Sequence, residues 1–210
     1  MAEPGLRAVG LHLPDIRDRY DLVIANGENA ARGKGLDRRS YRLLREAGVD
    51  LVSLGNHAWD HKEVYALLES EPVVRPLNYP PGTPGKGFWR LEVGGESLLF
   101  VQVMGRIFMD PLDDPFRALD RLLEEEKADY VLVEVHAEAT SEKMALAQGA
   151  VAEQPLRAIW YYTHFGTILN KWLPDADSGA LTAASFAGKN TEVLAPLAEK
   201  ILCVRGLRSY

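Results

Sequence analysis

The chain has 210 residues, of which 47% are hydrophobic, and a formal net charge of −6. This length and composition suit one large domain with a substantial buried core. The negative charge argues against a surface that coats nucleic acid, which needs clustered Lys and Arg, so metal ions would have to supply positive charge for phosphate binding.

The first strand expected along the chain is a short apolar run over residues 22–25. Residues 1–20 precede it with a Pro-Gly turn signal and a short helical pattern. The apolar run ends in Asn26-Gly27-Glu28-Asn29. Asn-Gly is typical of a hairpin turn, and spacing alone favours Glu28 as a surface turn residue.

A second strand is predicted over residues 51–54, after a helical pattern over residues 40–47. Gly55 is expected to turn the backbone sharply, so that Asn56 and His57 lie at the strand end where open α/β sheets place their chemistry. An Asn oxygen can bind a cation, and a His can donate a proton to a leaving oxygen. An ordinary turn, with His57 as a helix cap, explains this tripeptide equally well.

The middle of the chain favours a mixed α/β sheet. A helix is predicted over residues 62–70, followed by a rigid Pro- and Gly-rich loop over residues 78–87. Residues 88–93 and 97–103 predict a β-hairpin. The earlier alternation of strands and helices implies parallel pairing, so the hairpin makes the sheet mixed.

Residues 106–115 predict an irregular loop that carries three aspartates, namely Asp110, Asp113 and Asp114. A carboxylate metal site is one interpretation of this loop. Asp before Pro is more typical of turns and helix starts, which favours the simpler explanation. The amphipathic residues 116–127 then predict a helix with an acidic end.

His136 follows another apolar run, residues 130–135. A single His at a strand end is more often packed in a core than bound to a metal. Its interpretation changes because Glu28 and Asn56-His57 also follow strands, and parallel strand ends share one edge of a sheet. Such oxygen and imidazole ligands suit Mn, Fe or Zn better than Mg or Ca. Two ions about 3.5–4 Å apart would clamp a phosphate and activate water.

Five segments together resemble the YmdB-like bacterial branch of the calcineurin-like metallophosphoesterases. They are residues 24–30, 54–60, 75–85, 105–109 and 136–143. The resemblance covers residues 1–147. It implies an α/β fold in the form of a layered α/β/β/α sandwich with a mixed sheet. It also implies a dinuclear metal site and hydrolysis of small phosphodiesters, 2′,3′-cyclic nucleotides among them.

The resemblance implies a role for each matching residue. Glu28 resembles the carboxylate that bridges two metal ions, and Asn56 and His136 resemble ligands of the second ion. His57 resembles the general acid that protonates the leaving oxygen, and Asn29 resembles a residue that contacts substrate or metal. The implied cofactors are divalent ions, with Fe or Mn favoured and Zn as a further candidate. The family holds two such ions.

Two departures from the family pattern lead us to expect an incomplete metal site with one ion or none. The family begins with a strand that ends in Gly-Asp, a ligand of the first metal, and this sequence starts just past that point. Beyond residue 148 the family carries Gly-Thr-His-Thr-His, whereas residues 149–210 offer only His164. We therefore expect an N-terminally truncated metallophosphoesterase-like domain over residues 1–147, without the usual first strand, and a divergent or unrelated segment over residues 148–210.

The C-terminal segment is predicted not to complete the sheet. Residues 180–187 and 193–201 have helical patterns, and residues 158–162 are the best strand candidate but short. The loss of the first strand would then leave an exposed strand edge, which favours homo-oligomers. A reading-frame change and a divergent subdomain both explain such a segment.

Two functions of different classes follow from the sequence. The first is a metal-dependent phosphodiesterase that acts on small phosphodiesters or cyclic nucleotides. The alternative is a non-catalytic remnant that binds a metal or a nucleotide, or an inactive truncated or frame-shifted product. A cytoplasmic location is expected because Cys203 is the single cysteine. The sequence also shows no signal-peptide pattern and no membrane-spanning apolar run.

Overall fold

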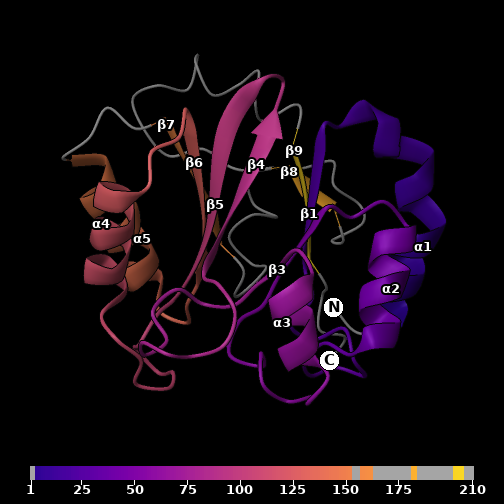
Figure 1. The fold of residues 1–210 in the computed structure, drawn as a ribbon, viewed down its shortest axis with the longest axis horizontal. Coiled ribbons are helices and arrows are strands. Elements are labelled where there is room, and N and C mark those ends of the chain that lie inside the picture. Colours follow the sequence, from indigo (N-terminus) through magenta and orange to yellow (C-terminus); the bar gives the residue numbers. More distant parts are fainter. Residues whose placement is uncertain (1–2, 153–156, 163–180, 184–200, 206–210) are drawn as a thin grey trace.

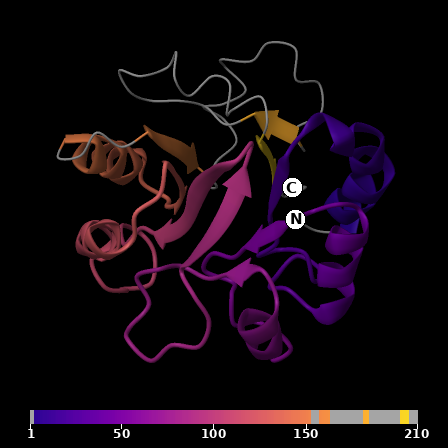
Figure 2. The same cartoon turned by 45° about the horizontal axis from the view of Figure 1, so that its top comes forward.

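The computed structural model describes residues 3–152, 157–162, 181–183 and 201–205. Two β-sheets pack face to face, and helices cover the outer face of each (Figure 1). The view of Figure 2 shows the same order of layers. This arrangement confirms the predicted α/β fold with mixed sheets.

The first sheet has five strands in the order β3-β2-β1-β9-β8. Their bounds are Leu22–Asn26 for β1, Leu51–Ser53 for β2, Val73–Val74 for β3, Leu181–Ala183 for β8 and Ile201–Arg205 for β9. β1 pairs in parallel with β2 on one side and with β9 on the other. β8 is antiparallel to β9, so the sheet is mixed.

The second sheet has four strands in the order β4-β5-β6-β7. Their bounds are Phe88–Val93 for β4, Glu96–Met104 for β5, Tyr130–His136 for β6 and Arg157–Tyr162 for β7. β4 and β5 form the predicted hairpin, turned by Gly94 and Gly95, which both have positive φ. β6 is parallel to both of its neighbours.

Within the described residues, five α-helices cover the outer faces of the sheets. Their bounds are Glu3–Ile16 for α1, Arg38–Glu46 for α2, Val64–Ser70 for α3, Pro115–Glu125 for α4 and Thr140–Ala152 for α5. A short 3₁₀ helix at Arg17–Arg19 follows α1. Helices α1, α2 and α3 pack on the first sheet, and α4 and α5 pack on the second. None of the described helices is long and apolar enough to cross a membrane.

The sheets are held together by an apolar layer that follows from the two-residue period of a strand. In β1, Val23 and Ala25 face the helices, whereas Leu22 and Ile24 face the other sheet. Phe100 of β5 packs in that inner layer and is fully buried. Burying such a side chain contributes roughly 1.5–3 kcal/mol, so this layer fixes how the strand ends of the two sheets face each other.

The prediction that residues 148–210 do not complete the sheet is wrong for the described strands. β7 extends the second sheet, and it contains the strand candidate at residues 158–162. β9 pairs along β1, so the edge that was expected to be exposed is filled. Residues 181–183 form a strand within the predicted helix at 180–187. His164 and most of residues 193–201 lie outside the described residues.

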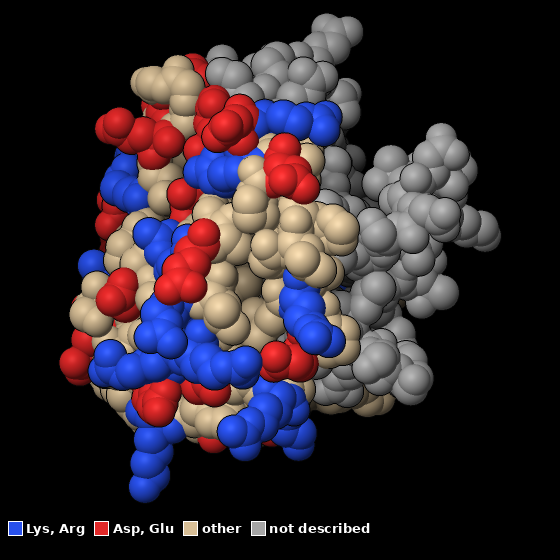
Figure 3. Space-filling model, turned by 90° about the vertical axis from the view of Figure 1, so that its right-hand side faces the viewer, with Lys and Arg blue, Asp and Glu red and all other residues tan. Residues whose placement is uncertain are grey.

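The surface formed by α1 and α2 carries both signs of charge. Acidic and basic side chains are interspersed over this face (Figure 3). Arg39 forms an ion pair with Glu3, and Arg42 forms one with Glu46.

Candidate metal centre

The predicted ligands lie at strand ends that come from both sheets. Glu28 and Asn56 follow β1 and β2 of the first sheet, and His136 is the last residue of β6 in the second. The loops after these strands gather at the lower end of the molecule in Figure 1. Strand order alone predicted convergence at the edge of a single sheet, and the family resemblance implied a two-sheet sandwich. The structure joins the edges of two sheets.

Glu28, Asn56 and His136 form one cluster. His136 Nε2 lies 3.0 Å from Asn56 Oδ1 and 3.5 Å from Glu28 Oε2. His136 is 0% exposed and Glu28 is 3% exposed. A carboxylate oxygen, an amide oxygen and an imidazole nitrogen therefore meet in a place that little solvent reaches.

Gly55 makes room for this cluster. A Cβ atom at Gly55 would lie 2.1 Å from Glu28 Oε2 and 2.7 Å from both His136 Cε1 and His136 Nδ1. The Glu28 carboxylate and the His136 imidazole thus pack directly against the Gly55 backbone. Gly55 was expected for its conformational freedom, but it is not among the glycines with positive φ. Its role is to permit a close approach.

Asn29 orients the carboxylate of Glu28. Its Nδ2 donates a hydrogen bond to Glu28 Oε1 over 3.1 Å. Its Oδ1 is buried and has no hydrogen-bond partner among the residues that the structure describes. A buried oxygen of this kind normally needs a partner, which makes Asn29 Oδ1 available to a ligand.

His57 is held by Asp60, a residue that the sequence analysis did not single out. His57 Nδ1 lies 2.8 Å from Asp60 Oδ2. The helix after this loop, α3, has Glu63 at its N-cap, so His57 is not a helix cap. The carboxylate instead fixes the orientation of the imidazole ring, as positioned acids and bases require.

Three polar residues inside the strands join the two sheets behind the cluster, and none of them was predicted. Asn26 Nδ2 donates to Glu134 Oε1 over 2.8 Å, which links β1 to β6. Gln102 Nε2 donates to the backbone oxygen of Leu54 over 2.9 Å, which links β5 to the segment before Gly55. The available signal was a polar residue within an otherwise apolar run, because such a residue needs a partner when buried.

At the end of the aspartate loop after β5, Asp114 has the simpler of the two predicted roles, which is to start a helix. Asp114 Oδ1 accepts hydrogen bonds from the backbone N–H groups of Phe116 and Arg117 and caps α4. Across the described part of the chain, no three His, Cys, Asp or Glu side chains gather in a way that could hold a metal ion. The strand-end cluster is of a different kind, because its third member, Asn56, is an amide.

Asn78 ties the Pro- and Gly-rich loop to the end of β5. Its side chain accepts a hydrogen bond from the N–H of Met104 and donates to the backbone oxygens of Met104 and Asp113. The buried Arg75 stiffens the same loop by donating to backbone oxygens, among them those of Thr83 and Gly85. The loop is therefore anchored at both ends next to the cluster.

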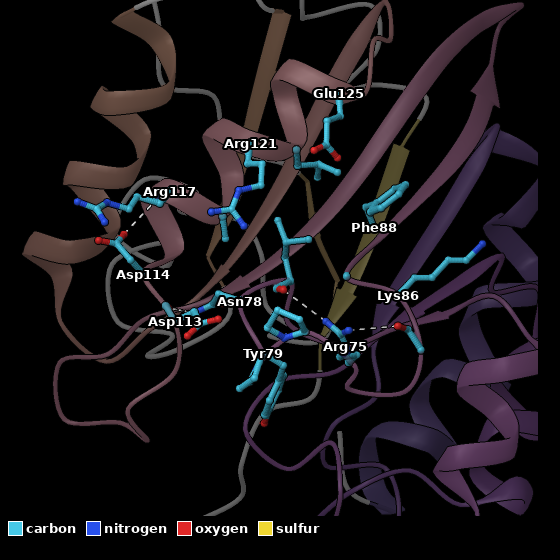
Figure 4. A pocket seen from close by; sticks show the side chains of 17 residues that line it. Arg75, Asn78, Tyr79, Lys86, Phe88, Asp113, Asp114, Arg117, Arg121 and Glu125 are labelled. Atoms are coloured by element: carbon cyan, nitrogen blue, oxygen red, sulfur yellow. Dashed lines mark hydrogen bonds between the residues drawn. The ribbon is translucent and has the colours of Figure 1, made fainter.

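A pocket of about 600 Å³ lies between this loop and α4 (Figure 4). Arg75 and Tyr79 line it from the loop, and Arg121 and Glu125 line it from α4. Burial raises the pKa of Tyr79, and the negative charges of Asp110 and Glu28 raise it further.

The family model described as YmdB-like protein matches residues 1–174, which extends beyond the predicted limit at residue 147. A 2′,3′-cyclic-nucleotide 2′-phosphodiesterase from Bacillus subtilis is 40% identical over 180 residues, covering 83% of this chain and 67% of the relative. Two curated relatives from Mycoplasma species are 35% and 33% identical. The chain spans only about half of each, at 53%.

Two solved structures share the fold. A hypothetical protein from Thermus thermophilus is 74% identical, with a TM-score of 0.76 over 98% of this chain and 71% of that one. A phosphatase from Mycoplasma pneumoniae is 24% identical, with a TM-score of 0.69 over 96% of this chain and 66% of that one. At that identity the second likeness shows the fold alone.

Proposed function

The chain belongs to the YmdB-like protein family, and from that premise we propose that it is a metal-dependent phosphodiesterase. The observation that carries the proposal is the placement of Glu28, Asn56 and His136 around the bare backbone of Gly55. The Bacillus relative is named for action on 2′,3′-cyclic nucleotides. We propose the same class of small substrate for this chain.

The residues of the cluster fit a divalent metal ion. Glu28, Asn56 and His136 would hold it with two oxygen donors and one nitrogen donor, a set that favours Mn, Fe or Zn over Mg or Ca. The space at Gly55, which a single Cβ would fill, keeps the carboxylate and the imidazole close together. When bound, the ion would polarise a phosphoryl oxygen of the substrate.

The chain's own residues supply binding and proton transfer. Asn29 holds the Glu28 carboxylate in place and offers its own buried oxygen as a contact for metal or substrate. We assign the general acid to His57, whose Nδ1 is anchored by Asp60. The other ring nitrogen, Nε2, is then the atom that gives a proton to the leaving oxygen.

Replacing His57 with alanine tests this assignment, because the general acid is not a metal ligand. We expect kcat for 2′,3′-cyclic AMP to fall about 100-fold while the bound metal stays unchanged. Metal content and turnover should be measured on the same preparation. His61→Ala is the matched control, since His61 Nε2 contacts the backbone oxygen of Lys34 and not the cluster.

Each result separates the candidate functions. A His57→Ala protein that loses its metal would show that His57 is a ligand and would overturn the assignment. Wild-type protein that binds metal or nucleotide without any turnover would support the alternative, a non-catalytic binding protein.

A further inference from the structure

Phe108 is presented to solvent in an unusual way. Its side chain is 89% exposed, although it is large and apolar. Its φ angle is +62°, in the left-handed region that a bulky residue rarely adopts. Both the exposure of the apolar ring and the strained backbone cost free energy. Backbone strain of this kind is concentrated at binding sites.

The loop that carries Phe108 is fixed by a buried carboxylate. Glu142 is 7% exposed, and it accepts hydrogen bonds from the N–H groups of Arg106 at 2.9 Å and of Ile107 at 3.3 Å. A Cβ at Gly105 would lie 2.2 Å from Glu142 Oε2, so the loop backbone passes directly over this carboxylate. The exposed ring therefore stands on an anchored backbone.

This loop begins beside the proposed metal centre. β5 ends at Met104, which is paired with His136, and the N–H of Gly105 donates to the backbone oxygen of His136 over 2.8 Å. Phe108 lies three residues further on, so its Cα is within roughly 11 Å of that of Gly105.

We propose that Phe108 binds the nucleobase of the substrate by stacking, as a specificity residue of the phosphodiesterase. This inference rests on the proposed function, because the cluster would hold the phosphate while the ribose spans the interval to the base. Every base has a π-face, so an aromatic platform accepts all four bases. The substrate class is then cyclic nucleotides with little preference among bases, rather than base-free phosphodiesters.

Steady-state kinetics of Phe108→Ala test the proposal. We expect KM for 2′,3′-cyclic AMP to rise about tenfold, equivalent to about 1.4 kcal/mol, with little change in kcat. KM for a base-free substrate, methyl riboside 2,3-cyclic phosphate, should stay as in the wild type. Phe108→Trp should keep the wild-type KM for the nucleotide. Ile107→Ala is the matched control, since Ile107 lies in the same loop and is 43% exposed.

A binding measurement separates this inference from the enzyme proposal. On adding wild-type protein, the adenine H2 and H8 protons of 3′-AMP should shift upfield from the ring current of Phe108, and Phe108→Ala should remove that shift. This result without any turnover would uphold the base site and overturn the enzyme. Equal KM values for Phe108→Ala and wild type would overturn the base site. If Phe108→Ala left KM unchanged but dissociated a dimer formed by the wild-type protein, Phe108 would belong to a contact between two copies of the chain. That result would also overturn the base site.

Discussion

Replacing His136 with alanine should remove the bound metal ion and abolish phosphodiester hydrolysis. His136 supplies the one imidazole of the cluster, and its Nε2 faces both Asn56 Oδ1 and Glu28 Oε2. Without it the ion would lose one of its three ligands, and the remaining oxygen donors suit Fe and Zn less well. We expect metal affinity to fall at least about 100-fold, because loss of even an outer partner of a ligand costs roughly 10- to 100-fold.

The measurement is metal content by mass spectrometry after dialysis against a defined concentration of Mn²⁺. His12→Ala is the control, since His12 lies exposed on α1 and away from the cluster. A circular dichroism spectrum and melting curve would establish that the His136→Ala protein is folded. Equal metal content in folded His136→Ala and wild-type protein would refute the assignment of His136 as a ligand.

Replacing Gly55 with alanine should disrupt the site as completely, although it removes no ligand. The new Cβ would lie 2.1 Å from Glu28 Oε2, closer than any such contact can be. Glu28 and His136 are both enclosed, so one of them has to move. A displacement of about 1 Å can lower catalysis roughly 100-fold. Overpacking should also lower the free energy of unfolding by about 1–3 kcal/mol.

The matched control is Gly10→Ala in α1. A Cβ at Gly10 meets no atom within 4 Å. Alanine also has a better helix propensity than glycine, so this variant should be as stable as the wild type or more so. Metal content, turnover and urea unfolding should be measured for both variants. Normal metal binding and turnover in Gly55→Ala would mean that the close approach at Gly55 does not shape the site.

The members of the cluster could be singled out from the sequence because their signals are local, and the family resemblance grouped them. An apolar run marks each strand, and Glu28, Asn56 and His136 stand directly at or after the strand ends. Parallel pairing places the ends of β1 and β2 together, whereas His136 reaches them from the other sheet, which strand order alone did not predict. The hairpin of β4 and β5 could be predicted for the same reason, since Gly94-Gly95 is a local turn signal.

Features that depend on contacts between distant segments could not be predicted. The family resemblance implied the two-sheet sandwich, but it did not predict that β9 pairs with β1 from the far end of the sequence. Residues 201–204 include Ile and Val, but the helical pattern over residues 193–201 runs into them and obscures the strand. The supports from Gln102 and Glu142 likewise act across long sequence separations.

A Mn²⁺ titration of the chelated wild-type protein, with bound metal and turnover of 2′,3′-cyclic AMP followed together, tests metal-dependent hydrolysis most directly. Turnover should be absent from the metal-free protein and should rise in proportion to the metal bound until the site is full. Turnover that persists unchanged when the metal content has been reduced to trace levels would contradict a metal-dependent phosphodiesterase.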